Sequence, residues 1–322
     1  MRMTNRMMSN SYLKNLNNSL EKMNETNYLI TAERSYMKLS DDPATALKAM
    51  KVRKSLSRIE IYENNLSDAQ GIIDQYESTI SSINSISKEA LAQVLQGITG
   101  TSDINVKKTV AKTLRGFQET ILAAANTKYG DDYIFGGDQV GKAPFSLDGS
   151  GNLLYNGQNV ETGTFHDEFR YIDVGIGLDV DASGNVAPKS AFNVSTSGAV
   201  LLGTGVDGNG ITNNLHNLLG DIAEKFENDD LSDIQLYSDK LNEKASDIRI
   251  QYVSIGAKSD YISFFSERLY SEKTNAAKRQ SELEGINLEE AIIIFSEQEL
   301  AYNACLQMGS KLLQPSLMDY LR

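Results

Sequence analysis

A glycine-rich stretch in the middle of the chain comes closest to a ligand-binding motif. Gly203-Thr204-Gly205-Val206-Asp207-Gly208 has the spacing GxGxxG, follows the apolar run 199–202 and precedes a predicted short helix. In dinucleotide-binding proteins such glycines let the backbone approach a pyrophosphate at a helix N-terminus. No second strand follows to complete a βαβ unit, and a lone fingerprint is a weak signal. We therefore interpret the stretch as a flexible return from the middle of the chain, and keep a nucleotide-binding enzyme as the weakest alternative.

A second stretch resembles part of a calcium-binding loop. The spacing of the first half of such a loop is matched by Asp179, Asp181, Ser183 and Gly184. An EF-hand loop needs a bidentate glutamate at its twelfth position, and Ser190 stands there instead. Because that ligand is missing, a hairpin turn is the better interpretation, and we predict no metal site.

The remaining reactive side chains are isolated from one another. His166 and His216 are the two histidines, and they lie fifty residues apart with no cysteine nearby. A zinc site or a nucleophile–base pair is therefore poorly supported. The single cysteine, Cys305, has heptad spacing with apolar neighbours, which favours a small packing residue over a reactive thiol. We predict that the protein is not an enzyme and holds no cofactor.

Composition argues against nucleic acid and membrane as partners. The chain has 322 residues, a formal net charge of −12 and a pI near 4.8, without the dense basic patch of a nucleic-acid-binding surface. Its fully apolar runs, such as residues 291–295, are far shorter than a membrane span. The start MRMTNRMMSN has no continuous apolar core, so we expect no cleaved signal peptide. A single cysteine excludes an internal disulfide, which suits a cytosolic protein or one that is exported unfolded.

Charge is distributed unevenly along the chain. Residues 1–60 hold eleven Lys and Arg against six Asp and Glu, whereas residues 281–322 hold two against seven. Ends of opposite charge suit two termini that lie side by side or that meet neighbouring subunits, although each surface charge pair contributes little.

Two long apolar stripes with a 3.5-residue period dominate the rest of the sequence. One runs from Val52 to Val94 and the other from Leu231 to Ile262, each with few polar interruptions. This period gives a helix one narrow apolar seam, which must be buried against another helix. Because the two seams are alike and far apart in the sequence, we predict that the chain folds back on itself and that these helices pair as a long rod. Ser40-Asp41-Asp42-Pro43 predicts the start of the first long helix.

Shorter stripes of the same kind occur at both ends. Met3–Met37 and Leu288–Leu321 each carry a narrow stripe, and such helices are marginal without a partner. We interpret the two as a pair whose seams also form the assembly interface between subunits. The predicted interface residues are Leu13, Leu16, Leu20, Met23, Ile30, Ile294, Ala301, Cys305, Met308, Leu312, Leu317 and Leu321.

Between the long helices the pattern changes. From Tyr133 to about Gly210 glycine-rich clusters read as hairpin turns, and Ile172–Val180 alternates as a half-buried strand does. The predicted fold class is therefore mainly α: a long antiparallel coiled-coil rod formed by both chain ends, with a small inserted β-rich domain. The predicted parts are a terminal helical assembly domain at 1–40 and 285–322, a helical rod at 41–137 and 211–284, and an insert at 138–210. The change of pattern at both borders predicts an autonomous insert, whose deletion leaves the rod folded.

Four groups of short motifs occur in order along the chain. They are Arg2-Met3-Thr4 with Leu39-Ser40-Asp41-Asp42-Pro43-Ala44; Ala125-Asn126-Thr127-Lys128-Tyr129 with Tyr133-Ile134-Phe135-Gly136-Gly137 and Pro144-Phe145; Arg249 with Ile255-Gly256-Ala257; and Leu312-Leu313-Gln314-Pro315-Ser316-Leu317-Met318-Asp319-Tyr320-Leu321. Together they resemble the flagellin-like axial proteins of the bacterial flagellum, most closely the hook-associated protein 3 family of hook–filament junction proteins. Each motif is short, but four groups in the right order are specific. The resemblance covers all but the variable middle of the chain.

This resemblance implies a structural role in motility and a set of neighbours. A junction protein of this family would link the hook, through hook-associated protein 1, to the flagellin filament, as a ring of identical subunits. It would be extracellular, having passed through the flagellar secretion channel, and an export chaperone would hold its carboxyl end beforehand. Neither nucleic acid nor a membrane is expected as a partner.

Flagellin itself is the nearest alternative, because it shares the terminal helices. Flagellins typically continue the Asp-Asp pair with an Ala-Ala-Gly run, whereas Pro43 follows here, and they lack the Tyr133–Gly137 motif. One departure from the junction family is its Ser-Gly-Lys turn, in whose place this chain has Thr31–Tyr36. We therefore expect a differently shaped link between the first two helices, and assign no interface role to Thr31–Lys38.

Overall fold

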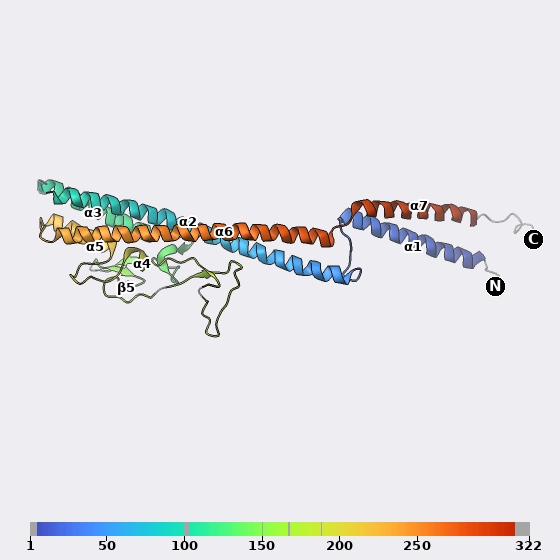
Figure 1. Ribbon diagram of the computed structural model, residues 1–322, viewed down its shortest axis with the longest axis horizontal. Coiled ribbons are helices and arrows are strands. Elements are labelled where there is room, and N and C mark those ends of the chain that lie inside the picture. Colours follow the sequence, from blue (N-terminus) through green and yellow to red (C-terminus); the bar gives the residue numbers. More distant parts are fainter. Residues whose placement is uncertain (1–4, 100–102, 150, 167, 188, 313–322) are drawn as a thin grey trace, which may run out of the picture. The chain divides into compact units, whose positions relative to one another are not determined.

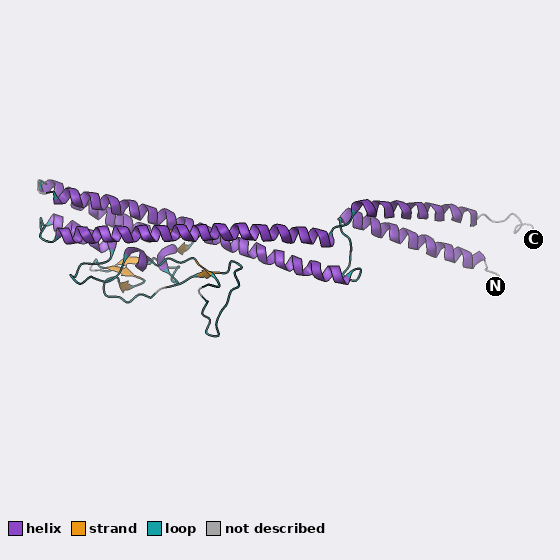
Figure 2. Cartoon of the chain, in the orientation of Figure 1, coloured by secondary structure: helices purple, strands orange, loops and turns teal. Residues whose placement is uncertain are grey.

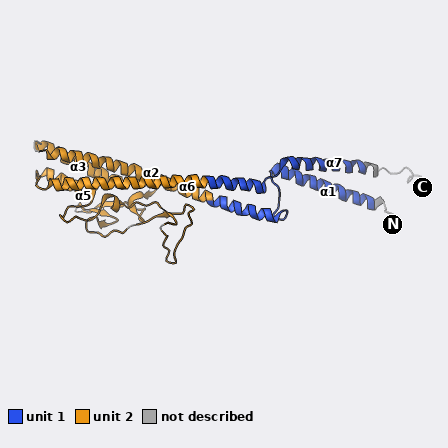
Figure 3. Ribbon diagram, in the orientation of Figure 1, with its two compact units in different colours: residues 1–58, 271–322 blue, residues 59–270 orange. Residues whose placement is uncertain are grey.

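Helices make up most of the structure (Figure 1). The structure is a computed structural model, and it describes residues 5–99, 103–149, 151–166, 168–187 and 189–312. Short strands and loops occupy much of the stretch between α3 and α5 (Figure 2). In the described residues the helices are α1 (Asn5–Ala32), α2 (Pro43–Ile98), α3 (Ile104–Ala125), α4 (Gly198–Leu202), α5 (Leu215–Glu227), α6 (Ile234–Glu284) and α7 (Leu288–Leu312). The chain divides into unit 1, residues 1–58 and 271–322, and unit 2, residues 59–270 (Figure 3).

The start of α2 follows the predicted capping signal. The Asp42 side chain accepts a hydrogen bond from the Thr45 N–H at 3.1 Å, and Pro43 occupies the first helical position, where no N–H is needed. In the preceding turn the Asp41 carboxylate accepts from the Lys38 N–H at 2.8 Å. These hydrogen bonds favour the ionised carboxylates and lower the pKa of both aspartates.

The heptad seams of α2 and α6 are buried as predicted. In unit 2 the buried apolar residues of α2 recur every seven positions as Ile59, Leu66, Ile73 and Ile80. Those of α6 recur in the same way as Leu241, Ile248, Ile255 and Ile262. The two helices run side by side here, joined by hydrogen bonds from Tyr252 to Glu77 and from Gln70 to Ser259, and α3 packs along α5 (Figure 1). The predicted fold class, mainly α with long paired helices and a small β-containing insert, is confirmed.

The strands are much shorter than predicted. Three antiparallel sheets are described: β1 (Lys128–Tyr129) with β2 (Asp132–Tyr133); β3 (Phe145–Leu147), β4 (Leu153–Tyr155) and β5 (Gln158–Asn159); and β6 (Tyr171–Ile172) with β7 (Phe192–Asn193). A 3-10 turn, η1 (Ile134–Gly136), follows β2. Loops and turns connect these elements.

The predicted half-buried strand at Ile172–Val180 is wrong beyond its first residue. Gly175 and Gly177 have φ of 81° and 103°, a left-handed conformation that breaks a strand. A Cβ at Gly175 would lie 2.7 Å from the ring of Tyr62 on α2, so the glycine also allows close approach to the helix. The alternation reflects a loop pressed against α2, with Val180 forming one isolated bridge to Val186.

The insert shares its core with the helices of unit 2. The ring of Phe192 on β7 stacks on Tyr261 of α6, with centroids 5.2 Å apart. Asn65 of α2 donates to the Asp173 carbonyl at 2.8 Å, and Lys258 of α6 donates to the Ser195 carbonyl at 2.8 Å. These contacts and the grouping of the insert with the helices in unit 2 speak against an autonomous insert, and the three-part division of the chain stays a prediction.

In unit 1, α1 and α7 form an antiparallel pair (Figure 1). The two helices lie close together along their length, as the charge asymmetry of the chain ends predicts. Gly309 of α7 faces Tyr12 of α1, and an added Cβ would overlap the tyrosine ring. The glycine therefore permits the close approach of the two helices at this point.

Candidate functional site

Tyr76 joins α2 to the Tyr133–Gly137 motif in the interior of unit 2. Its side chain is 2% exposed, and its hydroxyl donates to the Ile134 carbonyl and accepts from the Thr196 N–H at 3.2 Å. Its ring meets Phe135 edge to face, with centroids 5.1 Å apart. Burial raises the pKa of Tyr76 to about 12, so the hydroxyl stays protonated. The motif thus provides core residues that attach the start of the insert to α2.

The neighbouring motif residues have structural roles as well. The Asn126 amide pairs with both backbone groups of Phe145, accepting from its N–H at 3.0 Å and donating to its carbonyl at 2.9 Å. Gly137 has a φ of 65°, and an added Cβ would overlap the carboxylate of Glu168. Of the motif on α6, Gly256 is half-buried and Ala257 is exposed.

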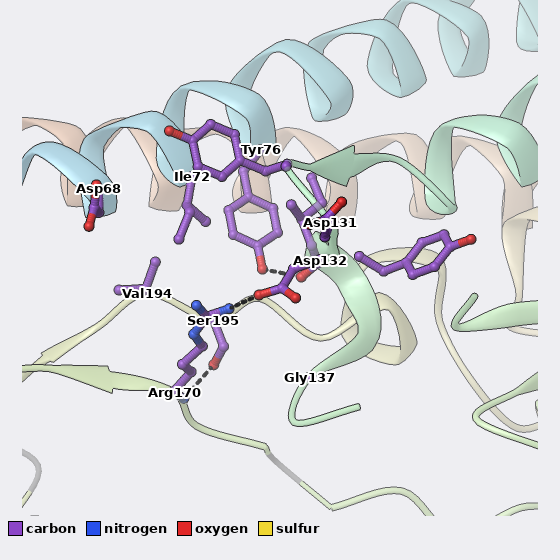
Figure 4. A pocket seen from close by; sticks show the side chains of 13 residues that line it. Asp68, Ile72, Tyr76, Asp131, Asp132, Gly137, Arg170, Val194 and Ser195 are labelled. Carbon is purple, nitrogen blue, oxygen red and sulfur yellow. Dashed lines mark hydrogen bonds and ion pairs between the residues drawn. The ribbon is translucent and has the colours of Figure 1, made fainter. Parts of the chain in front are cut away.

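A pocket of about 330 Å³ opens beside Tyr76 (Figure 4). Asp68 of α2 contributes one carboxylate to its lining, Asp131 of the β1–β2 turn a second and Asp132 of β2 a third. Arg170 is the basic residue of the lining, and its Nη1 lies 3.8 Å from the Asp132 carboxylate. In Figure 4 the apolar side chains of Ile72 and Val194 lie between Asp68 and the Asp132–Arg170 pair. No other labelled residue places a charged group between them.

The chemistry of this pocket suits binding of a cation better than catalysis. Three carboxylates against one guanidinium leave a net negative lining, while Ile72, Val194 and Tyr76 offer apolar surface. A side chain with an apolar stem and a cationic end matches both features. Among the described residues no group of three His, Cys, Asp or Glu is arranged to hold a metal ion.

The α1–α7 pair of unit 1 contains part of the predicted interface. Leu16, Leu20, Met23 and Ile30 of α1 are half-buried, and so is Cys305 of α7. Other residues of α7 on this side are Ala291, Phe295, Tyr302 and Gly309.

The remaining predicted interface residues lie elsewhere. Leu13, Ile294, Ala301 and Met308 are exposed. On α7, Phe295 and Tyr302 occupy the seam positions that the heptad count gave to Ile294 and Ala301. Leu312 ends α7, its side chain is outside the described residues, and Leu317 and Leu321 lie outside them altogether. The role of all these residues in assembly stays a prediction.

Several exposed apolar residues of α7 were missed by the heptad count. Ile292 and Ile293 are exposed, and Leu300 is exposed by 72%. The signal was present as the run 291–295, which places apolar side chains on more than one side of a helix. A helix that is apolar on several sides is typical of a buried element, yet in the described part of unit 1 it is α1 that packs along α7.

An ion pair in unit 1 anchors the link between α1 and α2. The Glu284 carboxylate accepts from Arg53 Nε and Nη2, both at 2.6 Å, which lowers the pKa of Glu284. The Glu284 carbonyl accepts from the Ser35 N–H at 2.8 Å, and Arg34 bridges to Gly285. The segment Thr31–Lys38, where the family turn is missing, is thus held against the end of α6. No pattern in the sequence indicates these contacts.

The glycine-rich stretch does not form a phosphate-binding loop. Val206 bridges to Thr212, and the Asp207 carboxylate accepts from the N–H groups of Asn209 and Ile211 at 2.8 and 3.0 Å. These contacts make a hairpin turn. The next helix, α5, begins only at Leu215 and has its own cap in Asn214. The helix N-terminus that a pyrophosphate needs is therefore already occupied by a side chain.

The other candidates for chemistry are structural too. The Asp181 carboxylate accepts from the N–H groups of Ser183 and Asn185, both at 2.8 Å, so the predicted hairpin turn is confirmed. His216 is buried beside Asn217, and burial lowers the pKa of its imidazole. Cys305 is half-buried on the seam side of α7, as a packing residue would be.

Comparison with known proteins found one family that matches part of the chain. Residues 3–139 match the family model described as the bacterial flagellin N-terminal helical region. No curated protein matches the sequence. Residues 3–139 are therefore similar to the amino-terminal helical region of flagellin, in agreement with the resemblance that the motifs in this part of the chain indicate.

Solved structures share the fold at low identity. The structure of a putative flagellar hook-associated protein from Vibrio parahaemolyticus has a TM-score of 0.61 and 17% identity, over 76% of this chain and 100% of that one. FlgL of Bacillus cereus has a TM-score of 0.53 and 18% identity, over 72% and 99%. The flagellar junction protein FlgL of Legionella pneumophila has a TM-score of 0.52 and 13% identity, over 74% and 100%. These likenesses show that the chain shares the fold of the three solved structures. Within the described residues, no helix combines the length and apolar character needed to cross a membrane.

Proposed function

We propose that this protein is a junction subunit of the flagellum, which links the hook, through hook-associated protein 1, to the flagellin filament. The observation that carries the proposal is the surface of α7, where Ile292, Ile293 and Leu300 are exposed in the single chain. Fully burying one such side chain contributes about 1.5–3 kcal/mol. Neighbouring chains that cover α7 and α1 would therefore gain most of their affinity from these helices.

The proposed mechanism is mechanical and not catalytic. Identical subunits polymerise through their terminal helices into a ring, and assembly buries apolar surface that one chain leaves exposed. Before export, a chaperone would hold the carboxyl end of the chain. The chain would then pass through the flagellar secretion channel and assemble outside the cell.

Two features support a junction subunit over a filament subunit. Pro43 begins α2 directly after the Asp41-Asp42 pair, and the Tyr133–Gly137 motif has a defined place in the core around Tyr76. Flagellin remains the second candidate because the matched family model is that of the flagellin N-terminal region.

The location of the protein in isolated flagella tests the proposal. Immunogold labelling with an antibody against the insert should mark a band at the end of the hook. Label along the whole filament would identify a flagellin instead, and flagella without label would overturn the proposed function.

A change of Leu300 to Asp tests the assembly mechanism. Leu300 is exposed in the single chain, so the melting temperature of the purified variant should stay within a few degrees of wild type. A carboxylate buried between subunits should cost several kcal/mol, so cells with the variant should release unpolymerised flagellin into the medium.

The matched control is Asn303→Asp, which adds the same charge at an exposed position that is already polar. It should leave filaments intact. Normal filaments on cells with Leu300→Asp would place this residue outside the assembly interface, and a collapsed melting temperature would place it in the core of the single chain.

A further inference from the structure

One face of α2 in unit 1 combines exposed apolar and basic side chains. Leu47, Met50, Lys51, Lys54 and Arg58, here called the basic stripe, are all exposed, Leu47 by 61% and Met50 by 52%. Leu47 and Lys54 are seven residues apart, as are Lys51 and Arg58. In a helix with heptad packing such pairs point to the same side, so the five side chains form one continuous surface.

The basic stripe has no acidic counterpart on its own helix. No Asp or Glu occurs between Asp42 and Glu60, so no carboxylate stands three or four residues from Lys51 or Lys54. Lys54 and Arg58 are like charges at i,i+4, which repel one another. A repulsive face with two large exposed apolar side chains is typical of a surface that another molecule covers.

The opposite charge is concentrated in the insert. Residues 131–210 hold eleven Asp and Glu against three Lys and Arg. The lining of the pocket beside Tyr76 includes Asp131 and Asp132 of this stretch together with Asp68 of α2, and Asp68 and Asp131 are exposed. Its apolar wall of Ile72 and Val194 would hold the stem of a lysine or arginine, and the carboxylates would hold the charged end.

We infer that the acidic pocket of one copy of this chain receives the basic stripe of a second copy. The inference rests on the proposed function, because an assembly of identical subunits brings the two surfaces together. The partner is a second copy because this chain itself carries both complementary surfaces. Two different surfaces that meet in this way make a heterologous contact, which closes into a ring when the rotation between copies allows it.

The proposed contact combines charge pairing with burial of apolar surface. Lys54 or Arg58 enters the pocket toward Asp68 and Asp131, while Leu47 and Met50 cover apolar surface around it. Long-range attraction between the acidic insert and the basic stripe orients the approaching copies, and salt weakens it. The terminal helices of unit 1 are not needed for this contact.

A charge swap in the full-length protein tests the inference. Sedimentation velocity at low salt should show self-association of the wild type that weakens at about 0.5 M salt, where the Debye length is only a few ångströms. Lys54→Glu with Arg58→Glu should weaken self-association at least tenfold, and so should Asp68→Lys with Asp131→Lys. Mixing the two variants should restore association, because each contact then joins opposite charges again.

The control variant carries Lys108→Glu and Lys112→Glu. These lysines are exposed on α3 at the same i,i+4 spacing as Lys54 and Arg58, and the change in net charge is identical. The control should associate as the wild type does, which separates the basic stripe from an effect of total charge. Circular dichroism should show the same helix content in every variant.

Three results would overturn the inference. They are a wild type that stays monomeric at low salt, a stripe variant that associates normally, and a mixture that fails to restore association. If the stripe variant still self-associates but no longer binds purified flagellin, the basic stripe serves a different partner and the inference also fails. The proposed function would survive each of these results as long as the label marks the end of the hook. Loss of that label would overturn the proposed function while the charge swap could still succeed.

Discussion

At the residue scale, the Tyr76 hydroxyl satisfies two backbone groups from distant segments of unit 2, the Ile134 carbonyl and the Thr196 N–H. Both groups are buried, and a buried backbone group without a partner costs about 1–3 kcal/mol. The Tyr76 ring also packs against Phe135, so one side chain holds the insert to α2 by two kinds of interaction. This explains why a tyrosine, and not another large apolar residue, occupies a seam position of α2.

Changing Tyr76 to Phe should therefore lower the free energy of unfolding by about 1–3 kcal/mol, because the ring stays while the hydrogen bonds are lost. Urea denaturation followed by circular dichroism measures this. Tyr28→Phe is the control, since Tyr28 is exposed and its change should cost less than about 0.5 kcal/mol. Equal effects of the two changes would mean that the Tyr76 hydroxyl contributes nothing.

At the element scale, the link between α1 and α2 depends on one carboxylate at the end of α6. Arg53 binds Glu284 through two hydrogen bonds, and the adjoining backbone of Glu284 and Gly285 holds Ser35 and Arg34. The pKa of Glu284 is lowered chiefly by Arg53, against the opposing effect of burial. The folded chain thus favours the ionised carboxylate.

A lowered pKa in the folded state has a definite consequence for stability. The contribution of Glu284 is fully present above the ordinary glutamate pKa of 4.5 and is lost as the pH falls through the lowered value. Glu284→Gln should therefore reduce the melting temperature at pH 7 and flatten its decline below about pH 4.5. Thermal melts from pH 3 to pH 7 measure both effects. The exposed neighbour Glu282 provides the control, and an identical profile for Glu282→Gln would contradict the role of the Arg53 pair.

At the scale of the whole molecule, the two units differ in how fully their apolar side chains are buried within one chain. Unit 2 places its insert on the same core as α2 and α6, through the contacts of Tyr76, Phe192 and Lys258. Burial of the Lys258 amine on this core lowers its pKa to about 8. Unit 1 instead leaves apolar side chains of α7 exposed, of which Leu300 is one. Unit 2 is therefore expected to be stable in the single chain, and unit 1 to gain stability from other subunits.

Deletion of residues 138–210 tests the shared core of unit 2. The deletion should remove Thr196, one partner of the Tyr76 hydroxyl, and expose the covered faces of α2 and α6, which costs several kcal/mol and broadens the thermal transition. Circular dichroism melts measure this. Replacing only residues 181–185 by Asn-Gly removes an exposed turn and should leave the melt unchanged. A sharp melt at the wild-type temperature after the full deletion would restore the autonomous insert.

Local sequence patterns were enough to find the helices and the capped start of α2, because heptad spacing and a capping aspartate act within a few turns of one helix. The Tyr133–Gly137 motif could be located in the sequence, but its role could not be explained there. That role depends on Tyr76, which is distant in the sequence and donates a hydrogen bond to the Ile134 carbonyl. The length of the predicted strand at Ile172–Val180 was overestimated for a related reason. Whether Gly175 continues a strand or presses a loop against Tyr62 depends on a helix about a hundred residues away.

The seam of α7 was decided by tertiary structure alone. Its sequence is apolar on several sides, so periodicity could not tell whether Ile294 or Phe295 faces α1, and only the packing of the two helices chose Phe295. The Arg53–Glu284 pair, between residues 231 apart, was equally invisible, because its strength depends on a distance that folding sets. The sequence by itself thus determined the periods, caps and charges of this protein. The partners of each seam and the acidic pocket came from tertiary structure, because they join segments that no local pattern relates.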